Sequence, residues 1–415
     1  MKINELATKT VEAMLAAGLS PRTVWYTHEA AFLPIIRTHE ASGKESFDRE
    51  TMTAYVRRVE NRIEQGEIGR EHYRRLIRGA QRITEMHDHG KLMWTAPKKA
   101  SRFKLNEYFQ TMLDEFLSSG KFSPKGMSDA KWVARKYFAW LITEGHVDLS
   151  DVGVVQVQGF MIYCGNRMRG SSVHNAKLYM KKLYGFLAEH GYSKETYEGL
   201  LNFKVSRESR LYPAATAEDI ATILNVIDRR IPGGKRDYAI VLLGAVTGLR
   251  AGDIANLRLT DIDWQKGEIR IAQSKTSKPL ALPLTADVGE AIKDYILNGR
   301  QETDCDAVFL RLHVPYRGFT NGGAIQDLYD AYYKRALYPR DAFDGKGFHS
   351  LRRATSTGLV TAGVPIEMAA QILGDTHINS MRKYVTLNSR HLKECALDFS
   401  GIEFLDVSET KGVRS

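Results

Sequence analysis

Residues Thr247–Leu257 read TGLRAGDIANL, and the architecture of the second half of the chain can be worked out from them. An apolar run at 237–246 precedes this stretch and predicts a helix that ends at Gly248. Glycine often follows the last turn of a helix, because it adopts the left-handed conformation at no steric cost. Asp253 lies three residues after Arg250, so we expect it to support the helix at Arg250 rather than to react.

Two short strands follow this helical region. Residues 268–273 and 280–284 alternate, with Ile269 and Ile271 expected on one face and the leucines of the second run alternating likewise. Residues 274–279 read SKTSKP and predict the turn between the strands. Further helices are predicted at 323–336, 350–361, 366–373 and 380–385. The second half is therefore expected to be mainly helical with one small antiparallel sheet.

Residues 1–208 are predicted to be helical throughout. Apolar positions recur at three- and four-residue spacing in 24–36, 52–63 and 73–86. Basic or Pro-containing linkers are predicted at 94–102 and 203–215. Thr216 then starts a new helix as its N-cap, with an acidic residue three positions on. We expect domains at 1–100, 104–206 and 212–415.

The two N-terminal units contain a weak internal repeat. Ser20-Pro21 and Ser123-Pro124 each predict an N-cap followed by proline at the first helical position. The segments 72–90 and 174–191 also correspond, and each ends in His-Gly. This pattern favours two tandem helical domains of one kind. The alternative is that two four-helix units resemble each other only because helices in general share the same capping residues and apolar spacing.

Composition and charge limit the classes of protein that fit. The net charge of the 415 residues is +10, and residues 1–103 carry 18 Lys and Arg against 13 Asp and Glu. A basic balance suits a polyanionic partner such as DNA, although many basic proteins bind no nucleic acid. Cys164, Cys305 and Cys395 are far apart, which argues against a disulfide framework or a zinc site. No apolar run is long enough for a membrane helix, and the N-terminus lacks the layout of a secretory signal.

Four motifs, taken together and in order, resemble the catalytic domain of the tyrosine recombinase (phage integrase) family. TGLRAGDIANL resembles that family's T-G-L-R-x-x-E/D-x-x-x-L, and HSLRRAT at 349–355 resembles its H-x-L-R-x-x-x. QILGDTHINSMRKY at 371–384 resembles L-G-H-x-x-I-x-x-T-x-x-Y, and QSKT at 273–276 places a lysine at the hairpin turn. One such motif means little, but four in this order over about 216 to 390 are hard to reach by chance.

The resemblance implies a role for each residue in breaking a DNA strand by transesterification. Tyr384 would be the nucleophile and form a 3′-phosphotyrosine, so that religation needs no ATP. Arg250 and Arg352 would hold the two non-bridging phosphate oxygens, because guanidinium groups match phosphate geometry and stay charged. His349 would assist proton removal from the tyrosine, and Lys275 would act as general acid toward the leaving 5′-oxygen. Lys278 is the alternative general acid.

One position departs from the family pattern. The family's second histidine, or tryptophan, stands nine residues before the tyrosine, where this chain has Asp375. An ionised carboxylate cannot donate a hydrogen bond to phosphate and would repel it. Three interpretations remain open. Asp375 points away while His377 takes the donor role, or Asp375 orients His349 or an arginine, or the site is weakened or restrained.

Several basic residues outside the motifs are candidates for contact with the DNA backbone, although each could equally be part of an ordinary solvated face. Tyr332, Tyr333 and Tyr338 are expected to be core or partner contacts. The candidate DNA-contacting residues are Arg74, Arg75, Arg78, Arg82, Lys177, Lys181, Lys182, Lys278 and Arg353.

The sequence thus predicts a mainly α fold with a small antiparallel β-sheet, in which two tandem helical DNA-binding domains precede a tyrosine-recombinase catalytic domain. The predicted function is site-specific recombination, with a mobile-element integrase or transposase favoured as the biological role. The alternatives are a type IB topoisomerase-like enzyme that relaxes DNA, and a DNA-binding accessory protein with an impaired site. We expect double-stranded DNA as partner, a tetramer joined through the C-terminal tail, no metal or other cofactor, and a cytoplasmic, nucleoid-associated location.

Overall fold

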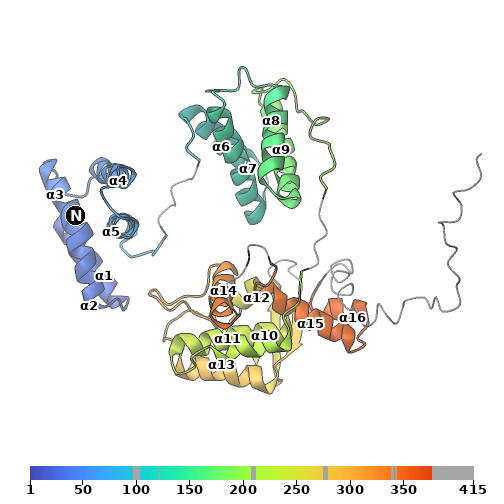
Figure 1. Cartoon of the computed structure of the whole chain (residues 1–415). Coiled ribbons are helices and arrows are strands. Elements are labelled where there is room, and N and C mark those ends of the chain that lie inside the picture. Colours follow the sequence, from blue (N-terminus) through green and yellow to red (C-terminus); the bar gives the residue numbers. More distant parts are fainter. Residues whose placement is uncertain are drawn as a thin grey trace, which may run out of the picture. The chain divides into compact units, whose positions relative to one another are not determined.

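The structure is a computed structural model that describes residues 1–96, 103–120, 122–206, 212–273, 279–337, 341 and 344–375. By their internal contacts, residues 103–206 fall in one compact unit, and residues 1–96 and 212–375 in the other. Four hydrophobic clusters are present in the described residues, within 3–94, 105–205, 215–351 and 359–373. Figure 1 shows the elements of each part in sequence colours.

Residues 1–96 form a helical bundle. The apolar faces of its helices pack into one cluster, in which Leu6, Phe32, Ile35 and Ile83 are fully buried. Ser20 accepts a hydrogen bond from the Thr23 N–H, as its predicted N-cap role requires. The helices are α1 (Ile3–Ala16), α2 (Pro21–Thr27), the π-helical η1 (His28–Phe32), α3 (Leu33–Ala41), α4 (Arg49–Glu64) and α5 (Arg70–His89).

Residues 103–206 form a second bundle with an aromatic core. Tyr137 and Tyr184 hydrogen-bond to each other through their hydroxyls at 2.5 Å, so that both buried polar groups have a partner. Ser123 accepts a hydrogen bond from the Gly126 N–H at the start of its helix, again as predicted. The helices are α6 (Glu107–Ser119), α7 (Pro124–Thr143), α8 (Val154–Arg167) and α9 (Gly170–Glu189). That the two bundles bind DNA stays a prediction.

Residues 212–375 combine helices with one small sheet. Thr216 and Asp219 form the predicted reciprocal cap at the first helix. The elements are α10 (Ala217–Asn225), α11 (Pro232–Thr247), α12 (Ala251–Ala255), the 3-10 helix η2 (Leu259–Asp261), β1 (Ile262–Asp263), β2 (Glu268–Ala272), β3 (Pro279–Pro283), α13 (Ala286–Asn298), α14 (Gly323–Leu337), α15 (His349–Thr361) and α16 (Ile366–Ile372).

The sheet is antiparallel in the order β1-β2-β3, and its register confirms the predicted alternation. Ile269 pairs with Leu282 and Ile271 with Leu280, and all four side chains are buried in the core shared with α11 and α13. The prediction missed β1, whose two residues are too few to produce an alternating pattern. The expected mainly helical fold with a small antiparallel sheet is confirmed. The helix predicted at 380–385 lies outside the described residues.

Candidate active site

Arg250 is positioned by the abrupt end of α11. Gly248 follows this helix with a φ of +64° and donates its N–H to the Gly244 carbonyl, which closes the last turn. A Cβ at Gly248 would lie 2.8 Å from a Leu373 methyl carbon, so the position also requires a small residue. Arg250 is then the N-cap of α12, and its side chain is 18% exposed. The predicted glycine stop therefore brings Arg250 to the edge of the buried core.

Arg352 enters the same place from α15 and is almost fully buried, at 2% exposure. Its Nη1 donates to the Gly248 carbonyl and its Nη2 to the Leu373 carbonyl, both at 2.9 Å. A buried guanidinium group is stable only when its donors are paired. The carbonyls at the ends of α11 and α16 thus fix Arg352 in one orientation.

Asp375 connects the two arginines. One carboxylate oxygen lies 2.6 Å from Nη2 of Arg250, and the other lies 2.9 Å from Nη2 of Arg352. The side chain is 10% exposed. The carboxylate therefore faces the guanidinium groups instead of pointing away, and each of its oxygens pairs with a different arginine. Among the alternatives at this position, the geometry favours the one in which Asp375 orients an arginine.

Arg250 retains one unused donor. Its Nη1 is buried and has no hydrogen-bond partner among the residues that the structure describes. Asp253, whose side chain is fully buried, has its Oδ2 3.9 Å from this nitrogen, within ion-pair range but beyond a hydrogen bond. An unsatisfied buried donor is costly, by about 1–3 kcal/mol. This nitrogen is therefore available to an incoming anionic group.

His349 is the first residue of α15, one turn before Arg352. Burial of the imidazole and the guanidinium groups of Arg353, Arg352 and Arg250 lower its pKa to about 4, against the opposing effect of Asp375. The three neighbouring guanidinium groups disfavour a further positive charge on the imidazole. A lowered pKa keeps the ring neutral at pH 7, where it can accept a proton.

The base of the hairpin that carries Lys275 is tied to this site. Gln273 is buried, and its Nε2 donates to the Leu373 carbonyl at 3.0 Å, the same oxygen that Arg352 contacts. Gly374 has a φ of +66°, and a Cβ there would lie 2.3 Å from the Gln273 amide. Sequence reasoning missed this role of Gln273. The available signal was that the alternation of Ile269 and Ile271 places Gln273 on the same buried face, next to the turn.

Several predicted residues lie outside the described part of the chain. Lys275 and Lys278 fall in 274–278, Tyr338 falls in 338–340, and His377 and Tyr384 fall after 375. The described structure thus brings together Arg250, His349 and Arg352 with Asp253 and Asp375.

Two predicted DNA contacts have structural roles instead. Arg82 is buried, forms an ion pair with Glu85 and donates to the Thr95 carbonyl at 2.6 Å. Arg353 is also buried, and its guanidinium donates to the carbonyls of Pro213 and Gly345. Glu85 is three residues from Arg82 on the same helix, but the other partners are loop residues, which periodicity alone could not reveal. In this structure neither arginine is available to a phosphate.

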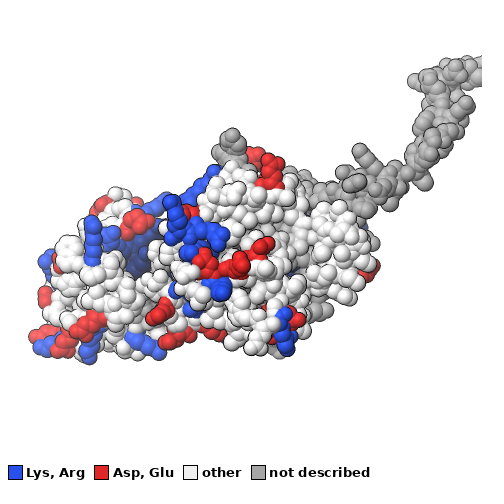
Figure 2. Space-filling view, turned by 90° about the horizontal axis from the view of Figure 1, so that it is seen from below, with Lys and Arg blue, Asp and Glu red and all other residues white. Residues whose placement is uncertain are grey.

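The other basic candidates are more accessible. Arg74, Arg75 and Arg78 are exposed on α5, and Lys182 is exposed on α9. Lys177 donates to the Phe203 carbonyl, and Lys181 lies 3.9 Å from a Glu198 carboxylate oxygen. Figure 2 shows Lys and Arg side chains interspersed with acidic ones on the face in view. Tyr333 is buried as expected, and Tyr332 donates to Asp237.

Comparison with known proteins identifies the family. Residues 214–391 match the phage integrase family. The putative integrase/recombinase y4gC of Sinorhizobium fredii is 38% identical over 191 residues, which are 45% of this chain and 95% of that protein. A second S. fredii protein, the putative integrase/recombinase y4rA, is 29% identical over 278 residues, which are 65% of each. The chain belongs to the phage integrase family, the tyrosine recombinases.

Solved structures share the fold. XerH recombinase bound to its difH substrate matches with a TM-score of 0.53 and 17% identity, covering 69% of this chain and 82% of that one. A lambda integrase dimer bound to a core site matches with a TM-score of 0.51 and 16% identity, covering 72% of this chain and 99% of that one. Among the described residues, no helix is long and apolar enough to cross a membrane.

Proposed function

We propose that this protein carries out site-specific DNA recombination through a 3′-phosphotyrosine intermediate. The observation that carries the proposal is the convergence of Arg250 and Arg352 on the two oxygens of a single carboxylate. Two guanidinium groups that hold two oxygens on one central atom are also arranged to hold two non-bridging oxygens of a phosphodiester. Family membership supports the same conclusion from independent evidence.

The chemistry assigns a step to each side chain. The Tyr384 oxygen attacks the phosphorus, a phosphorus–oxygen bond to the tyrosine forms, and the bond to the 5′-oxygen breaks. The neutral His349 accepts the tyrosine proton, and Lys275 gives a proton to the departing 5′-oxygen. The arginines stabilise the negative charge of the pentavalent transition state. In recombination, the 5′-hydroxyl of a different strand then attacks the phosphotyrosine, and Tyr384 is released.

Asp375 holds the place of the phosphate before DNA binds. Its carboxylate keeps the guanidinium groups at a separation that suits two oxygens, and it compensates the charge of the buried Arg352. When the scissile phosphate arrives, its negative charge displaces the carboxylate, and His377 supplies the hydrogen-bond donor two residues further on. The carboxylate is thus both a support for the arginines and a competitor of the substrate.

Specific DNA sites are the proposed substrate, and basic side chains that are exposed or partly exposed on both helical bundles would contact their backbones. Arg74, Arg75 and Arg78 on α5 and Lys177, Lys181 and Lys182 on α9 remain candidates for these contacts. We further propose a tetramer on paired sites, joined through the C-terminal tail, that acts on DNA in the cytoplasm at the nucleoid.

Mobile-element integration or transposition is the proposed biological role. One solved structure of similar fold is a Tn1549 transposon integrase in complex with transposon right-end DNA, with a TM-score of 0.51 and 14% identity. That likeness shows the fold, and the role rests on the additional helical bundle at 1–96. A topoisomerase-like activity is not favoured, because the relatives found are integrases and recombinases.

A nicked suicide substrate tests the proposal. Cleavage close to a nick releases a short fragment and traps the protein covalently on the DNA. We expect the wild-type chain to form this adduct and Tyr384→Phe to form none. Tyr316→Phe is the matched control, because it removes one hydroxyl from the same unit. An adduct that survives in Tyr384→Phe, or its absence in the wild type on every cognate site, would refute the proposed chemistry.

A further inference from the structure

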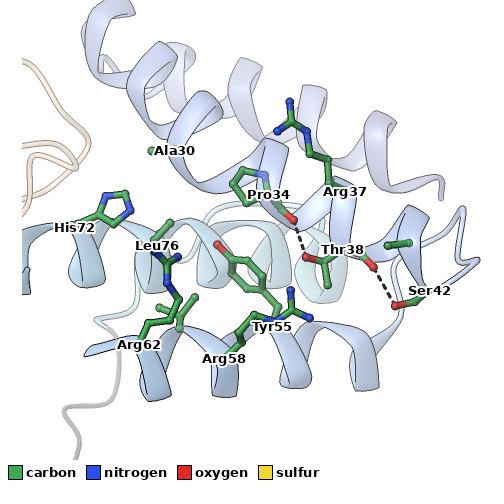
Figure 3. Close-up of a pocket in the computed structure, with 12 residues that line it drawn as sticks. Ala30, Pro34, Arg37, Thr38, Ser42, Tyr55, Arg58, Arg62, His72 and Leu76 are labelled. Carbon is green, nitrogen blue, oxygen red and sulfur yellow. Dashed lines mark hydrogen bonds between the residues drawn. The ribbon is translucent and has the colours of Figure 1, made fainter. Parts of the chain in front are cut away.

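A cavity lies between α3, α4 and α5 in the N-terminal bundle, and the recombination chemistry has no use for it. Its volume is about 570 Å³, which is within the range of sites for small ligands. Twelve residues line it, and four of them are basic: Arg37, Arg58, Arg62 and His72. No Asp or Glu is among these twelve (Figure 3). The lining therefore favours an anion.

Tyr55 gives the cavity an unsatisfied donor. The residue is only 4% exposed, yet its hydroxyl has no hydrogen-bond partner among the described residues. In Figure 3 its side chain points from α4 into the space below α3. Burial raises the pKa of Tyr55 to about 12, although Arg62 and Arg58 oppose the shift. The hydroxyl therefore keeps its proton and can donate it to a bound acceptor.

The positive charge of the cavity is only partly compensated. Arg62 forms an ion pair with Glu67, at 3.2 Å between its Nε and a carboxylate oxygen. Arg37 and Arg58 have no ion pair within the described part of the chain. Apolar side chains complete the lining, Pro34, Val59 and Leu76 among them. Charged donors beside an apolar wall match a phosphate that is attached to a less polar group.

The helix above the cavity has an unusual local geometry. The π-helical segment His28–Phe32 separates α2 from α3 and ends two residues before Pro34. Proline cannot donate an N–H to the preceding turn, and a widened π turn accommodates that loss. Such insertions are frequent at functional sites. Here the wide turn supplies Ala30 to the cavity wall, next to Pro34.

The second helical bundle provides an internal comparison. Arg37 is the sixteenth residue after Pro21, and the sixteenth residue after Pro124 in the second bundle is Trp140. Trp140 packs against Tyr137, Phe160 and Tyr163, with ring centroids 5.7–6.4 Å apart. Aromatic side chains therefore fill the space around this residue in the second bundle.

We propose that this cavity binds the phosphate of a nucleotide, with Arg58, Arg62 and the Tyr55 hydroxyl as its main donors. His72 lines the same wall and adds a further nitrogen, and the apolar residues contact the sugar or base. The nucleotide is either free or part of the DNA backbone. Both sources present the same phosphate chemistry, so the experiment has one arm for each. The cavity residues are far from Arg250 and Arg352 in the sequence, and the proposed site is independent of strand cleavage.

Calorimetric titration of the full-length protein with inorganic pyrophosphate and with ATP tests the first source. We expect binding that weakens at least about tenfold in the double variant Arg58→Gln/Arg62→Gln, because two charged hydrogen-bond donors to the phosphate are lost. Tyr55→Phe keeps the ring in the core and should weaken binding about fivefold. Arg57→Gln is the matched control, since Arg57 is exposed on the same helix but does not line the cavity. We expect it to remain within about twofold of the wild type.

Fluorescence anisotropy with a labelled duplex tests the second source. A backbone phosphate in the cavity predicts that the double variant loses at least about fivefold more duplex affinity than Arg57→Gln, and that pyrophosphate competes with the duplex. A free nucleotide predicts equal duplex affinity in the two variants, with ATP binding lost only in the double variant. The proposal is overturned if the double variant and Arg57→Gln match in pyrophosphate, ATP and duplex binding. Neither readout depends on DNA cleavage.

Discussion

At the scale of single residues, Asp375 explains why two arginines can be held close together in the absence of DNA. Like charges so near each other repel, and the repulsion is strong where the environment excludes water. The Asp375 carboxylate lies between the guanidinium groups and cancels part of their charge. The same contact places a negative charge where the substrate phosphate has to bind. Stability and substrate binding therefore make opposite demands on this residue.

Asp375→Asn separates the two demands. The amide keeps the shape but loses the charge, so the scissile phosphate meets less competition. In a Tyr384→Phe background, where no cleavage occurs, we expect cognate DNA to bind about tenfold more tightly. The melting temperature should fall, because the buried Arg352 loses its counter-charge. We expect the free energy of unfolding to decrease by about 1–3 kcal/mol.

Asp304→Asn is the control for this substitution, because Asp304 is an exposed acidic residue in the same unit. It removes the same charge from the protein without touching the arginines, so DNA affinity and melting temperature should hardly change. Equal effects of the two substitutions on DNA affinity would show that Asp375 acts only through net charge.

The state of His349 leads to a prediction about pH. Its pKa in the folded protein is lowered from 6.5 to about 4, so the folded chain binds fewer protons than the unfolded chain between these values. The neutral imidazole therefore costs the folded state nothing above pH 6.5, and the free energy of unfolding decreases as the pH falls from 6.5 toward 4. NMR titration of the imidazole should give a pKa below 6.5 in the free protein. Binding of DNA phosphate should raise that pKa, and an ordinary value in the free protein would contradict the account.

At the scale of elements, the glycine after α16 controls the position of Asp375. Gly374→Ala introduces a Cβ at positive φ that also collides with the Gln273 amide. We expect the Leu373 carbonyl and Asp375 to shift, and covalent adduct formation to fall at least about tenfold. Gly363→Ala is the matched control, with a φ of +82° but nothing within 4 Å of the added carbon.

Gly363→Ala should lower the free energy of unfolding by about 1 kcal/mol, because alanine is strained at positive φ, and should leave adduct formation nearly unchanged. Similar losses of activity in both variants would mean that strain at either glycine, and not the contact with Gln273, is what matters.

The basic face of α5 contains two classes of arginine, and substitutions should distinguish them. Arg78→Gln should lower DNA affinity and reduce the salt dependence of binding by about one unit of slope, because Arg78 is exposed. Arg82→Gln should instead lower the melting temperature, since it breaks the buried ion pair with Glu85. Anisotropy at several salt concentrations and thermal melting measure the two effects. A loss of DNA affinity in Arg82→Gln with an unchanged melting temperature would refute the structural role of Arg82.

Most elements could be predicted from sequence because their signals are local. The caps at Ser20, Ser123 and Thr216, the glycine stop at 248 and the alternation in β2 and β3 each involve neighbouring residues, and the structure confirms them. The burial of Arg82 and Arg353 could not be predicted in this way. Their partners at Thr95, Pro213 and Gly345 are loop residues that show no periodic pattern.

At the scale of the whole molecule, the motifs predicted that Arg250, His349 and Arg352 would lie near one another, but not how the two arginines would pair. Arg250 comes from the start of α12, and His349 and Arg352 come from the first turn of α15, which is far away in the sequence. The pairing of both arginines with Asp375 depends on where α16 ends in space. A sequence cannot give that position, because a carboxylate at this point could equally have faced solvent.

The most direct test of the central claim is to identify the residue that becomes attached to DNA. The trapped covalent complex is digested with nuclease and trypsin, and the modified peptide is identified by mass spectrometry. Cleavage after Lys383 and Arg390 releases the peptide YVTLNSR, which begins at Tyr384. The account predicts a nucleotide on this tyrosine, and loss of the adduct when either Arg250 or Arg352 is replaced by Ala. A nucleotide on any other residue, or an adduct that forms unchanged without both arginines, would contradict it.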